Sequence, residues 1–567
     1  MNEASPAGTL GAYATREAER YGIECLLNCV LREVALPRGE ARLDYRGGDR
    51  PEALRTMTVL RMRVGRGRLV IAVAQASRLG RCHFASAPFH RPGPGARWQP
   101  LGLDALTQAL APQIATLVAD SRDSLELFLR RLHVLPAPLR SSADALRDSE
   151  QFQLWGDAMD PAPKARGRVD PTALAYGSPE TGSALQLQWF AVDPGLIRWL
   201  GPERGEMLDC IAGLPDLYPC HPWAAARLQE NPAFRQLLAS GRIAPAGLRG
   251  LPLYPTGSVR TLYHPALPAM LRMSVPARID GENGWQAWSE LERSVRLSHL
   301  LGRVLDTSEA EPGGQTLLLL REPSASTLAL DSPGAGQVLA DGFGIVYPMQ
   351  IPVALRDRLR PRVASSLFTW SRNELGRPAS IRAIALTVEK LTLPTTEAAV
   401  LWLSRYVRLL AGGVMRAWLA HGVALAPRLP DVLIGSDAVG LPARLWLRGT
   451  ERVRLLRRRW AGEWRQGRVL CDEEEGWRHL VDALLVGNIA EAVFHLALAT
   501  GVDEAALWGV VRCEFRHLRD RLGGDRLAAL CDGEAWPTRR RLGPGEVLLP
   551  SAFVGLPEEV ETSRAFG

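Results

Sequence analysis

The chain has 567 residues, a formal net charge of +7, 46% hydrophobic residues and 23% charged residues. This length exceeds the size at which one hydrophobic core stops growing, so we expect two to four domains. The composition excludes disordered and collagen-like classes and is typical of a globular protein. The first residues, Met1–Pro6, lack a basic segment followed by an apolar core, so we expect a cytoplasmic protein without a secretory signal.

The first region, residues 1–140, is predicted to be an α+β unit that ends at Pro136–Pro138. Its hydrophobic pattern predicts a helix, a hairpin and a helical segment, over Tyr21–Val34, Met57–Val73 and Leu103–Leu135. Cys25 and Cys29 lie four residues apart in the first helix, so they share one of its faces. We interpret them as packing residues.

The second region, residues 141–344, is predicted to contain an antiparallel sheet. Its clearest strand is Ala184–Val192, and a helix is expected over Gly284–Leu305. Glycine and proline punctuate Asp331–Gly344. We interpret this stretch as a loop or domain boundary.

The third region, residues 345–567, is predicted to be mostly helical, with one strand pair at Asp431–Ile434 and Ala443–Leu447. Its most apolar stretches, Val407–Ala426 and Leu480–Val502, are interrupted by charged residues and histidines. They are therefore expected to be amphipathic or buried helices, with no membrane span. Together the three regions predict an α+β fold.

The most informative stretch is a predicted β-hairpin over residues 255–275. Alternation of side chains with period 2 places Arg260 opposite Arg272 and Ser258 opposite Ser274. Two opposed arginines repel each other unless an anion lies between them, so the hairpin indicates a site for a phosphate or carboxylate. The alternative is that both arginines are solvated on the surface.

Neither the basic residues nor the cysteines indicate a nucleic-acid or metal site. Only Lys164 and Lys390 are lysine among 68 basic residues, so a retained lysine indicates a role that arginine cannot fill. The basic run Arg452–Arg468 is followed by Asp472–Glu475, and such adjacent blocks screen each other, so nucleic-acid binding is not expected. The eight cysteines show no CxxC pair or zinc spacing, and no metal ligand is assigned.

Four sequence elements match one protein family in order. They are Gly156–Arg166, Tyr176–Glu180, Tyr218–Trp223 and Ser258–Thr261. These resemble the G-H-P-x-H-P-x-x-K-x-R, Y-S-P-E, H-P-W-Q and S-x-R-T elements of the IucA/IucC family of NRPS-independent siderophore synthetases. The resemblance spans nearly the whole length. The C-terminal region also resembles the ferric-reductase-like part of this family, although it lacks a cysteine cluster for iron and sulfur.

This resemblance implies a hand-like fold with a thumb (1–140), fingers (141–344) and a mostly helical palm (345–567). It implies a cytoplasmic protein of siderophore biosynthesis that uses ATP and magnesium to convert a carboxylate, often of citrate, into an acyl adenylate. An amine or hydroxyl then captures the acyl group. The implied partners are a small polycarboxylate or amine substrate, and a second copy or a paralogous synthetase.

The resemblance also implies roles for particular residues. The implied nucleotide-binding residues are Lys164, Arg166, Ser258, Arg260, Thr261 and Arg448. The implied catalytic residues are Arg260, Arg272 and His221.

Several residues of the family's pattern are replaced in this chain. The two histidines of the first element are Asp157 and Asp160, which would repel ATP unless arginine or a metal neutralises them. The other replacements are Arg272 for a lysine, Asp280 and Gly284 for a threonine and an arginine, Ala426–Asp431 for an E-x-H-x-Q-N run, and Gly449 for the acid after Arg448.

These replacements leave two hypotheses about function. Losing one preorganised electrostatic group commonly costs about 3 kcal/mol at a reacting centre, so ordinary adenylation requires a changed site. The first hypothesis is a diverged ligase that still joins a carboxylate to an amine or hydroxyl. The second is a non-catalytic homologue that binds a carboxylate ligand or an active partner synthetase. The ordered motifs disfavour a third class, a basic binding protein unrelated to small-molecule chemistry.

Overall fold

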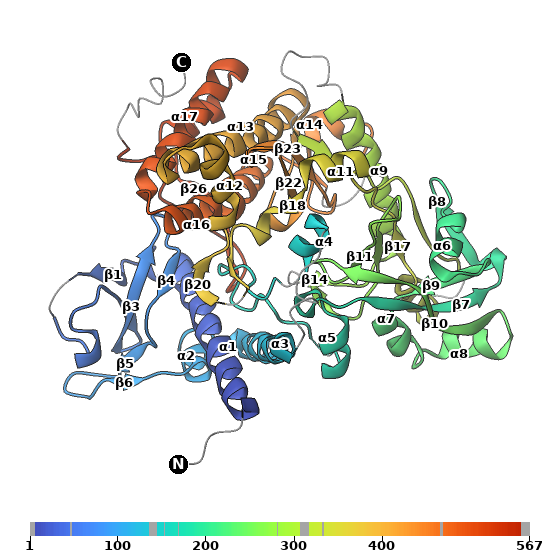
Figure 1. Ribbon diagram of the computed structural model, residues 1–567, viewed down its shortest axis with the longest axis horizontal. Coiled ribbons are helices and arrows are strands. Elements are labelled where there is room, and N and C mark those ends of the chain that lie inside the picture. Colours follow the sequence, from blue (N-terminus) through green and yellow to red (C-terminus); the bar gives the residue numbers. More distant parts are fainter. Residues whose placement is uncertain are drawn as a thin grey trace.

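The chain folds into three lobes that meet at the centre of the molecule, as Figure 1 shows. The structure is a computed structural model that describes residues 6–45, 48–134, 144–151, 153–167, 169–279, 282–306, 317–330, 334–372, 374–464 and 469–556. The α+β prediction is confirmed, because helices and antiparallel sheets both contribute to the core. The predicted region end at Pro136–Pro138 lies outside the described residues.

The N-terminal lobe packs helices on one face of a six-stranded sheet. The strands run in the order β1-β2-β3-β5-β6, and β4 pairs with β3. The elements are α1 (Pro6–Val30), the π-helical turn η1 (Leu31–Ala35), β1 (Ala41–Asp44), β2 (Val59–Val64), β3 (Gly67–Ala76), β4 (Cys82–Phe84), β5 (Phe89–Arg91), β6 (Gln99–Pro100), α2 (Leu103–Leu110) and α3 (Ala115–Val134).

Local sequence explains this packing. In β2 the buried Leu60 and Met62 alternate with the arginines, so one strand face is apolar. That face packs in a core with Leu26 of α1. Cys25 and Cys29 are fully buried on α1, which confirms their interpretation as packing residues, and burial raises the pKa of both thiols well above the ordinary range.

The middle lobe is built on an eight-stranded sheet in which every adjacent pair is antiparallel. Its order is β8-β16-β17-β12-β11-β10-β7-β9. The strands are β7 (Leu185–Val192), β8 (Ile197–Leu200), β9 (Leu217–Cys220), β10 (Ile243–Pro255), β11 (Thr261–Tyr263), β12 (Leu271–Met273), β16 (Ala325–Leu328) and β17 (Ile345–Val346), with a separate pair, β13 (Arg278–Ile279) and β14 (Glu282–Asn283). The helices are α4 (Ala145–Glu150), α5 (Pro171–Gly177), α6 (Gly205–Ala212), α7 (Pro222–Leu228), α8 (Pro232–Ala239), α9 (Trp288–Asp306) and α10 (Ala335–Gly342).

The predicted register of the arginine hairpin is wrong by one residue. In the structure Thr261, not Arg260, lies opposite Arg272. Eight residues connect the paired Leu262 and Leu271, one more than the predicted pairing leaves, and the connection contains a turn in which Leu267 N donates to His264 O at 3.1 Å. Ser258 lies in the turn before β11, where Val259 adopts a φ of +66°.

The expected loop at Asp331–Gly344 is also wrong in its described part. Residues Ala335–Gly342 form α10, and the chain then enters β17, which lies between β16 and β12 in the middle sheet. The glycines mark the start of this helix, where Gly334 has a φ of +71°. A boundary at residue 344 would therefore separate two adjacent strands of one sheet.

The C-terminal lobe is mostly helical, as predicted. Its helices are α11 (Val353–Leu359), α12 (Ile381–Leu391), α13 (Thr395–His421), α14 (Arg457–Trp460), α15 (Glu473–Val481), the π-helical η10 (Asp482–Ile489), α16 (Ala490–Thr500), α17 (Glu504–Leu522) and α18 (Asp525–Cys531). Its strands are β15 (Leu317–Leu319), β18 (Arg362–Val363), β19 (Trp370–Ser371), β20 (Glu374–Pro378), β21 (Val423–Ala424), β22 (Val432–Ser436), β23 (Pro442–Leu447), β24 (Arg454–Leu456), β25 (Leu470–Cys471), β26 (Trp536–Arg539) and β27 (Glu546–Leu549). The predicted strand pair is confirmed as β22 and β23.

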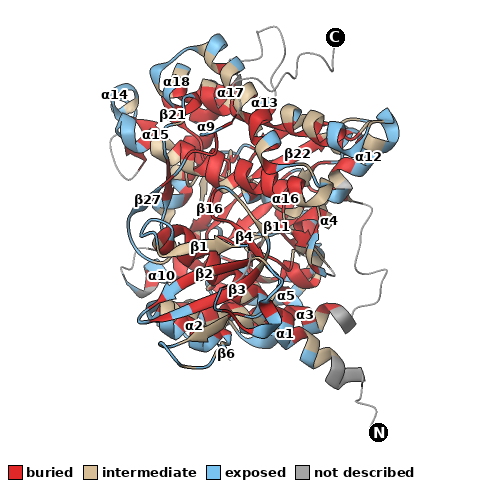
Figure 2. Cartoon of the chain, turned by 90° about the vertical axis from the view of Figure 1, so that its left-hand side faces the viewer, coloured by how far each residue is buried: buried red, intermediate tan, exposed pale blue. Residues whose placement is uncertain are grey.

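Two long apolar helices form the centre of this lobe. Thr395–His421 and Glu473–Thr500 are long and apolar enough to cross a membrane, but 61% and 78% of their most apolar windows are buried inside the protein. Figure 2 shows α13 and α16 coloured mainly as buried. This burial confirms the prediction of buried helices, since core helices satisfy the same length and composition test.

Candidate ligand-binding site

A cavity of about 380 Å³ lies where the three lobes meet. We call it the basic cavity, because ten basic and seven acidic side chains line it, an excess of three positive charges. The basic residues are Arg32, Arg81, Lys164, Arg166, Arg428, Arg448, Arg452, Arg539, Arg540 and Arg541, and the acidic residues are Glu33, Glu150, Asp157, Asp160, Glu180, Asp482 and Glu491. Its size is that of a small-molecule site.

The loop at 156–166 forms one wall of the basic cavity. Its two aspartates shape it, since Asp157 Oδ1 accepts a hydrogen bond from Met159 N at 2.9 Å and Asp160 Oδ1 accepts one from Ala162 N at 2.9 Å. The loop is fixed to α3, because Arg166 N donates to Asp120 Oδ2 at 2.8 Å. The residues that replace the expected histidines therefore have a structural role in the loop.

Lys164 and Arg166 point their charges at one buried carboxylate. Lys164 Nζ lies 2.8 Å and Arg166 Nη2 lies 2.6 Å from Glu180 Oε1. Burial alone would raise the pKa of Glu180, but the two cations outweigh it and hold this pKa below its ordinary value. Lys164 and Arg166 thus share one buried carboxylate on this wall.

Arg448 joins the cavity to the S-x-R-T turn. Its guanidinium forms a bidentate pair with Glu150, in which Arg448 Nη2 lies 3.2 Å from Glu150 Oε2. The same Oε2 accepts a hydrogen bond from Gly257 N at 3.1 Å. Within the turn, Ser258 Oγ accepts from Thr261 N at 3.3 Å. Gly257 lines the basic cavity, whereas Ser258 and Thr261 are not among its lining residues in the described part of the chain.

The C-terminal hairpin of β26 and β27 supplies another wall. Glu33 on the η1 turn holds the hairpin loop, because its two carboxylate oxygens accept from Arg541 N at 2.7 Å and Leu542 N at 2.9 Å. Burial would lower the pKa of Arg541, but Asp157 and Asp160 raise it above its ordinary value. Arg541 thus provides the neutralising charge that the two aspartates were predicted to need.

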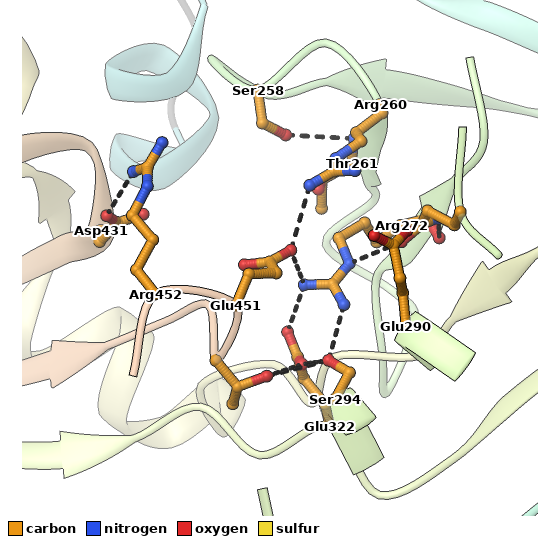
Figure 3. A network of polar contacts seen from close by, with 12 residues as sticks. Ser258, Arg260, Thr261, Arg272, Glu290, Ser294, Glu322, Asp431, Glu451 and Arg452 are labelled. Carbon is orange, nitrogen blue, oxygen red and sulfur yellow. Dashed lines mark hydrogen bonds and ion pairs between the residues drawn. The ribbon is translucent and has the colours of Figure 1, made fainter. Parts of the chain in front are cut away.

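Arg260 and Arg272 lie in a separate group, which Figure 3 shows, together with Glu322 and Glu451. We call these four residues the arginine–glutamate cluster. Glu451 Oε1 lies 3.1 Å from Arg260 Nη2 and 2.7 Å from Arg272 Nη1, and Arg272 Nη1 also lies 2.8 Å from Glu322 Oε1. The anion predicted between the two arginines is therefore a carboxylate of the protein itself. The alternative of two solvated arginines is wrong for Arg272, whose exposed fraction is 6%.

Polar neighbours complete the cluster. Arg272 Nε donates to Gln286 Oε1 at 3.2 Å, and its Nη2 donates to Ser294 Oγ at 2.7 Å. Burial opposes ionisation of Glu451, but Arg272 and Arg260 lower its pKa to about 2. Glu322 differs, because burial raises its pKa. The charges of the two arginines and the two glutamates thus balance within the protein.

His221 lies away from both groups. It is fully buried and caps α7, where its Nδ1 accepts a hydrogen bond from Trp223 N at 3.2 Å. Burial lowers the pKa of His221 to about 3, so the ring is neutral. Among the described residues it does not line the basic cavity, so the geometry gives it a capping role and does not support its predicted catalytic role.

Comparisons with known proteins agree with this fold. The family described as IucA / IucC family matches residues 145–369. A second family, described as ferric iron reductase FhuF-like transporter, matches residues 400–547. The rhizobactin siderophore biosynthesis protein RhbC of Rhizobium meliloti is 26% identical over 379 residues, which cover 62% of this chain and 63% of RhbC. The chain is therefore similar to the IucA/IucC family over residues 145–369.

Two further relatives extend the likeness along the chain. The L-2,3-diaminopropanoate–citrate ligase of Staphylococcus aureus is 23% identical over 435 residues, which cover 71% of each chain. The alignment with RhbC spans less than two thirds of that protein. The structure of ATP-bound aerobactin synthetase IucA from Klebsiella pneumoniae has a TM-score of 0.80 and 20% identity, and covers 94% of this chain and 99% of that chain. At this identity, the last likeness concerns the fold.

The motif matches found the cations of the site and one carboxylate partner, Glu180, but missed three other partners. Glu150, Glu322 and Glu451 lie outside the quoted motifs. One signal was available, since Glu451 follows the replaced acid position Gly449 by two residues. The segment Ala426–Asp431 does reach the basic cavity, where Arg428 Nη2 lies 2.9 Å from Asp482 Oδ2. Asp280 lies outside the described residues.

The basic cavity also collects buried polar atoms without hydrogen-bond partners. Of thirteen such side-chain atoms in the described part of the chain, six belong to residues that line it. They are Arg32 Nη2, Arg166 Nε, Arg428 Nε, Glu180 Oε2, Glu491 Oε1 and His495 Nδ1. Buried polar groups are normally paired, so this concentration indicates a place built for a polar ligand or water.

Proposed function

We propose that the protein acts in siderophore biosynthesis as a ligase that joins a carboxylate to an amine or hydroxyl through an acyl adenylate. The observation that carries this proposal is the set of buried, unpartnered N–H donors of Arg32, Arg166 and Arg428 in a cavity with an excess of positive charge. Forked guanidinium donors match phosphate and carboxylate oxygens. The similarity to the IucA/IucC family and the names of the citrate-ligase relatives support the same chemistry.

In this proposal the basic cavity binds the two anionic substrates. ATP would supply the adenylyl group that activates the carboxylate, and pyrophosphate would leave. Lys164, Arg166 and Arg448 would hold phosphate oxygens and compensate the charge that grows on them. The described residues contain no group of three histidine, cysteine or acidic side chains placed to hold a metal ion, so the ligands of Mg²⁺ stay unassigned.

A second candidate function is a non-catalytic homologue that binds a carboxylate ligand or a partner synthetase. The arginine–glutamate cluster favours it, because Glu322 and Glu451 occupy the donors of Arg272 that the family pattern would offer to substrate. In this case the basic cavity would bind a polycarboxylate without turnover. For both candidates we expect a cytoplasmic protein that pairs with a second copy or a paralogous synthetase.

One experiment separates the two candidates. The purified protein is titrated calorimetrically with ATP and Mg²⁺, then with citrate, and pyrophosphate release is measured with citrate and an amine present. ATP binding with carboxylate-dependent pyrophosphate release is the result expected for the ligase. Citrate binding without ATP binding or pyrophosphate release would support the second candidate, and binding of neither anion would contradict both.

A further inference from the structure

Two buried hydrogen-bond acceptors lie on one face of α16 at the wall of the basic cavity. Glu491 and His495 are one helical turn apart and have exposed fractions of 7% and 2%. Both line the cavity. Within the described chain, Glu491 Oε1 and His495 Nδ1 have no hydrogen-bond partner. Buried acceptors that stay unpaired lose the hydrogen bonds that water would give them, so a ligand that pairs with them gains affinity.

The protonation of His495 makes its Nδ1 an acceptor. Burial lowers the pKa of His495 well below its ordinary value, so the ring is neutral. Its Nε2 lies 3.8 Å from Glu491 Oε2, too far for a hydrogen bond. In the tautomer that carries its proton on Nε2, nearest this carboxylate, Nδ1 has a free lone pair. The Trp370 ring, whose centroid is 5.0 Å from that of His495, packs edge-on and restrains the imidazole.

Charged groups of both signs surround this pair. Arg81 Nε lies 3.5 Å from Glu491 Oε2, but Arg81 Nη1 also lies 2.9 Å from Glu24 Oε1, so two carboxylates share one guanidinium. Asp157 and Arg32 also act on Glu491, and burial raises the pKa of Glu491 above its ordinary value. Within the described residues Glu491 Oε1 stays without a hydrogen-bond partner.

We propose that Glu491 Oε1 and His495 Nδ1 form the binding subsite for a primary ammonium group of the second substrate. A primary ammonium carries three N–H donors and one positive charge, whereas a hydroxyl has one donor and no charge. The subsite thus selects an amine over an alcohol as the acyl acceptor. The cationic walls hold the anionic substrates, and this acidic corner holds the amine near them. The role of the bound amine as acyl acceptor rests on the proposed function, whereas binding of the amine does not require turnover.

The test is a calorimetric titration of the full-length protein, without ATP, with 1,4-diaminobutane and with 1,4-butanediol. We expect the diamine to bind more tightly than the diol. We expect Glu491→Gln to weaken diamine binding by about tenfold to a hundredfold, because a charge-assisted hydrogen bond is lost. Asp157→Asn keeps the Oδ1 atom that accepts from Met159 N and should weaken binding less. This second variant keeps the test open if Glu491→Gln does not fold.

The matched control is Glu514→Gln. Glu514 is also buried, with an exposed fraction of 5%, lies 2.9 Å from Arg408, and is not among the described residues that line the basic cavity. We expect this variant to keep the wild-type diamine affinity. No measurable diamine binding by the wild type, equal affinity for diol and diamine, or an equal loss in Glu491→Gln and Glu514→Gln would overturn the subsite. If the wild type releases no pyrophosphate but binds the diamine with an affinity that depends on Glu491, only the ligase proposal is contradicted.

Discussion

The basic cavity and the arginine–glutamate cluster use the same residue type in opposite ways. In the cluster, Arg260 and Arg272 face Glu451 and Glu322, so charges match one for one. In the cavity, basic side chains outnumber acidic ones by three, and several buried donors have no partner in the described chain. The cluster is therefore expected to stabilise the junction between lobes, and the cavity to bind anions.

This contrast shows that arginine content alone does not locate a ligand site. The carboxylates around each arginine decide whether its donors are available, since a buried pair is satisfied internally and gains little from an added anion. Lys164 and Arg166 share one glutamate, whereas Arg272 contacts two. Substitutions of single side chains test this difference between the cavity and the cluster.

The largest expected effect is a loss of stability in Arg272→Met. Removing this guanidinium leaves Glu322 buried without its counter-charge, which costs about 3–5 kcal/mol in the free energy of unfolding. Urea unfolding monitored by tryptophan fluorescence measures it. The control is Arg303→Met, since Arg303 pairs with Glu463 on the surface at 67% and 58% side-chain exposure and should lose less than about 1 kcal/mol. Equal losses in the two variants would show that the cluster is not a stabilising element.

A second prediction concerns acid stability and His221. The folded protein keeps this histidine neutral down to about pH 3, while the unfolded chain takes up a proton near pH 6.5. Stability is therefore lost as the pH falls from about 6.5 towards 3, by at most about 1.4 kcal/mol per pH unit. The His221→Asn variant keeps a side-chain acceptor for the cap but has no imidazole to protonate, so this acid-dependent loss of stability disappears. Unfolding curves at pH 7, 6 and 5 should show a smaller acid loss in the variant, and identical pH profiles would contradict the neutral cap.

A third prediction compares the two lysines of the chain. Lys164→Ala should weaken the binding of ATP or citrate by about tenfold or more, because a charged donor leaves the basic cavity. Glu180 keeps Arg166 as a partner, so the stability loss should be smaller than in Arg272→Met. Lys390→Ala is the matched control, since Lys390 is half-exposed and lies beside Glu389. Calorimetric affinities that are equal in the two variants would remove Lys164 from the site.

The smallest expected effect is that of Arg260→Ala on stability. Glu451 keeps its contact with Arg272 in this variant, so the free energy of unfolding should fall by only about 1 kcal/mol. The same urea titration measures the change. A loss as large as that of Arg272→Met would mean that the two arginines act as one unit.

The sequence predicted the fold where local patterns decide it. The alternation in residues 59–64 predicted the first hairpin, and the apolar stretch Val407–Ala426 predicted a buried helix. The register of β11 and β12 could not be predicted, because it depends on the length and geometry of the turn that joins them, where Leu267 N donates to His264 O. The helix α10 was missed because its glycines resemble a loop signal.

The sequence predicted several cations of the candidate site but not their arrangement. The motifs named Lys164, Arg166 and Arg448, which all line the basic cavity. They could not reveal which carboxylate meets which cation, because Glu150 and Arg448 are 298 residues apart along the chain. The same limit hid Glu491 and His495, since nothing in the sequence marks an unpartnered atom. The motif residue His221 caps α7, and its catalytic role stays a prediction.

The most direct measurement is a calorimetric titration of ATP and then citrate into the wild type, Arg166→Ala and Arg260→Ala at matched ionic strength. Arg166 lines the basic cavity and has an unpartnered Nε, whereas Arg260 is paired with Glu451 in the cluster. We expect the anion affinity to fall by about tenfold or more in Arg166→Ala and to stay unchanged in Arg260→Ala. The reverse pattern, with affinity lost only in Arg260→Ala, would contradict the assignment of binding to the cavity and of stability to the cluster.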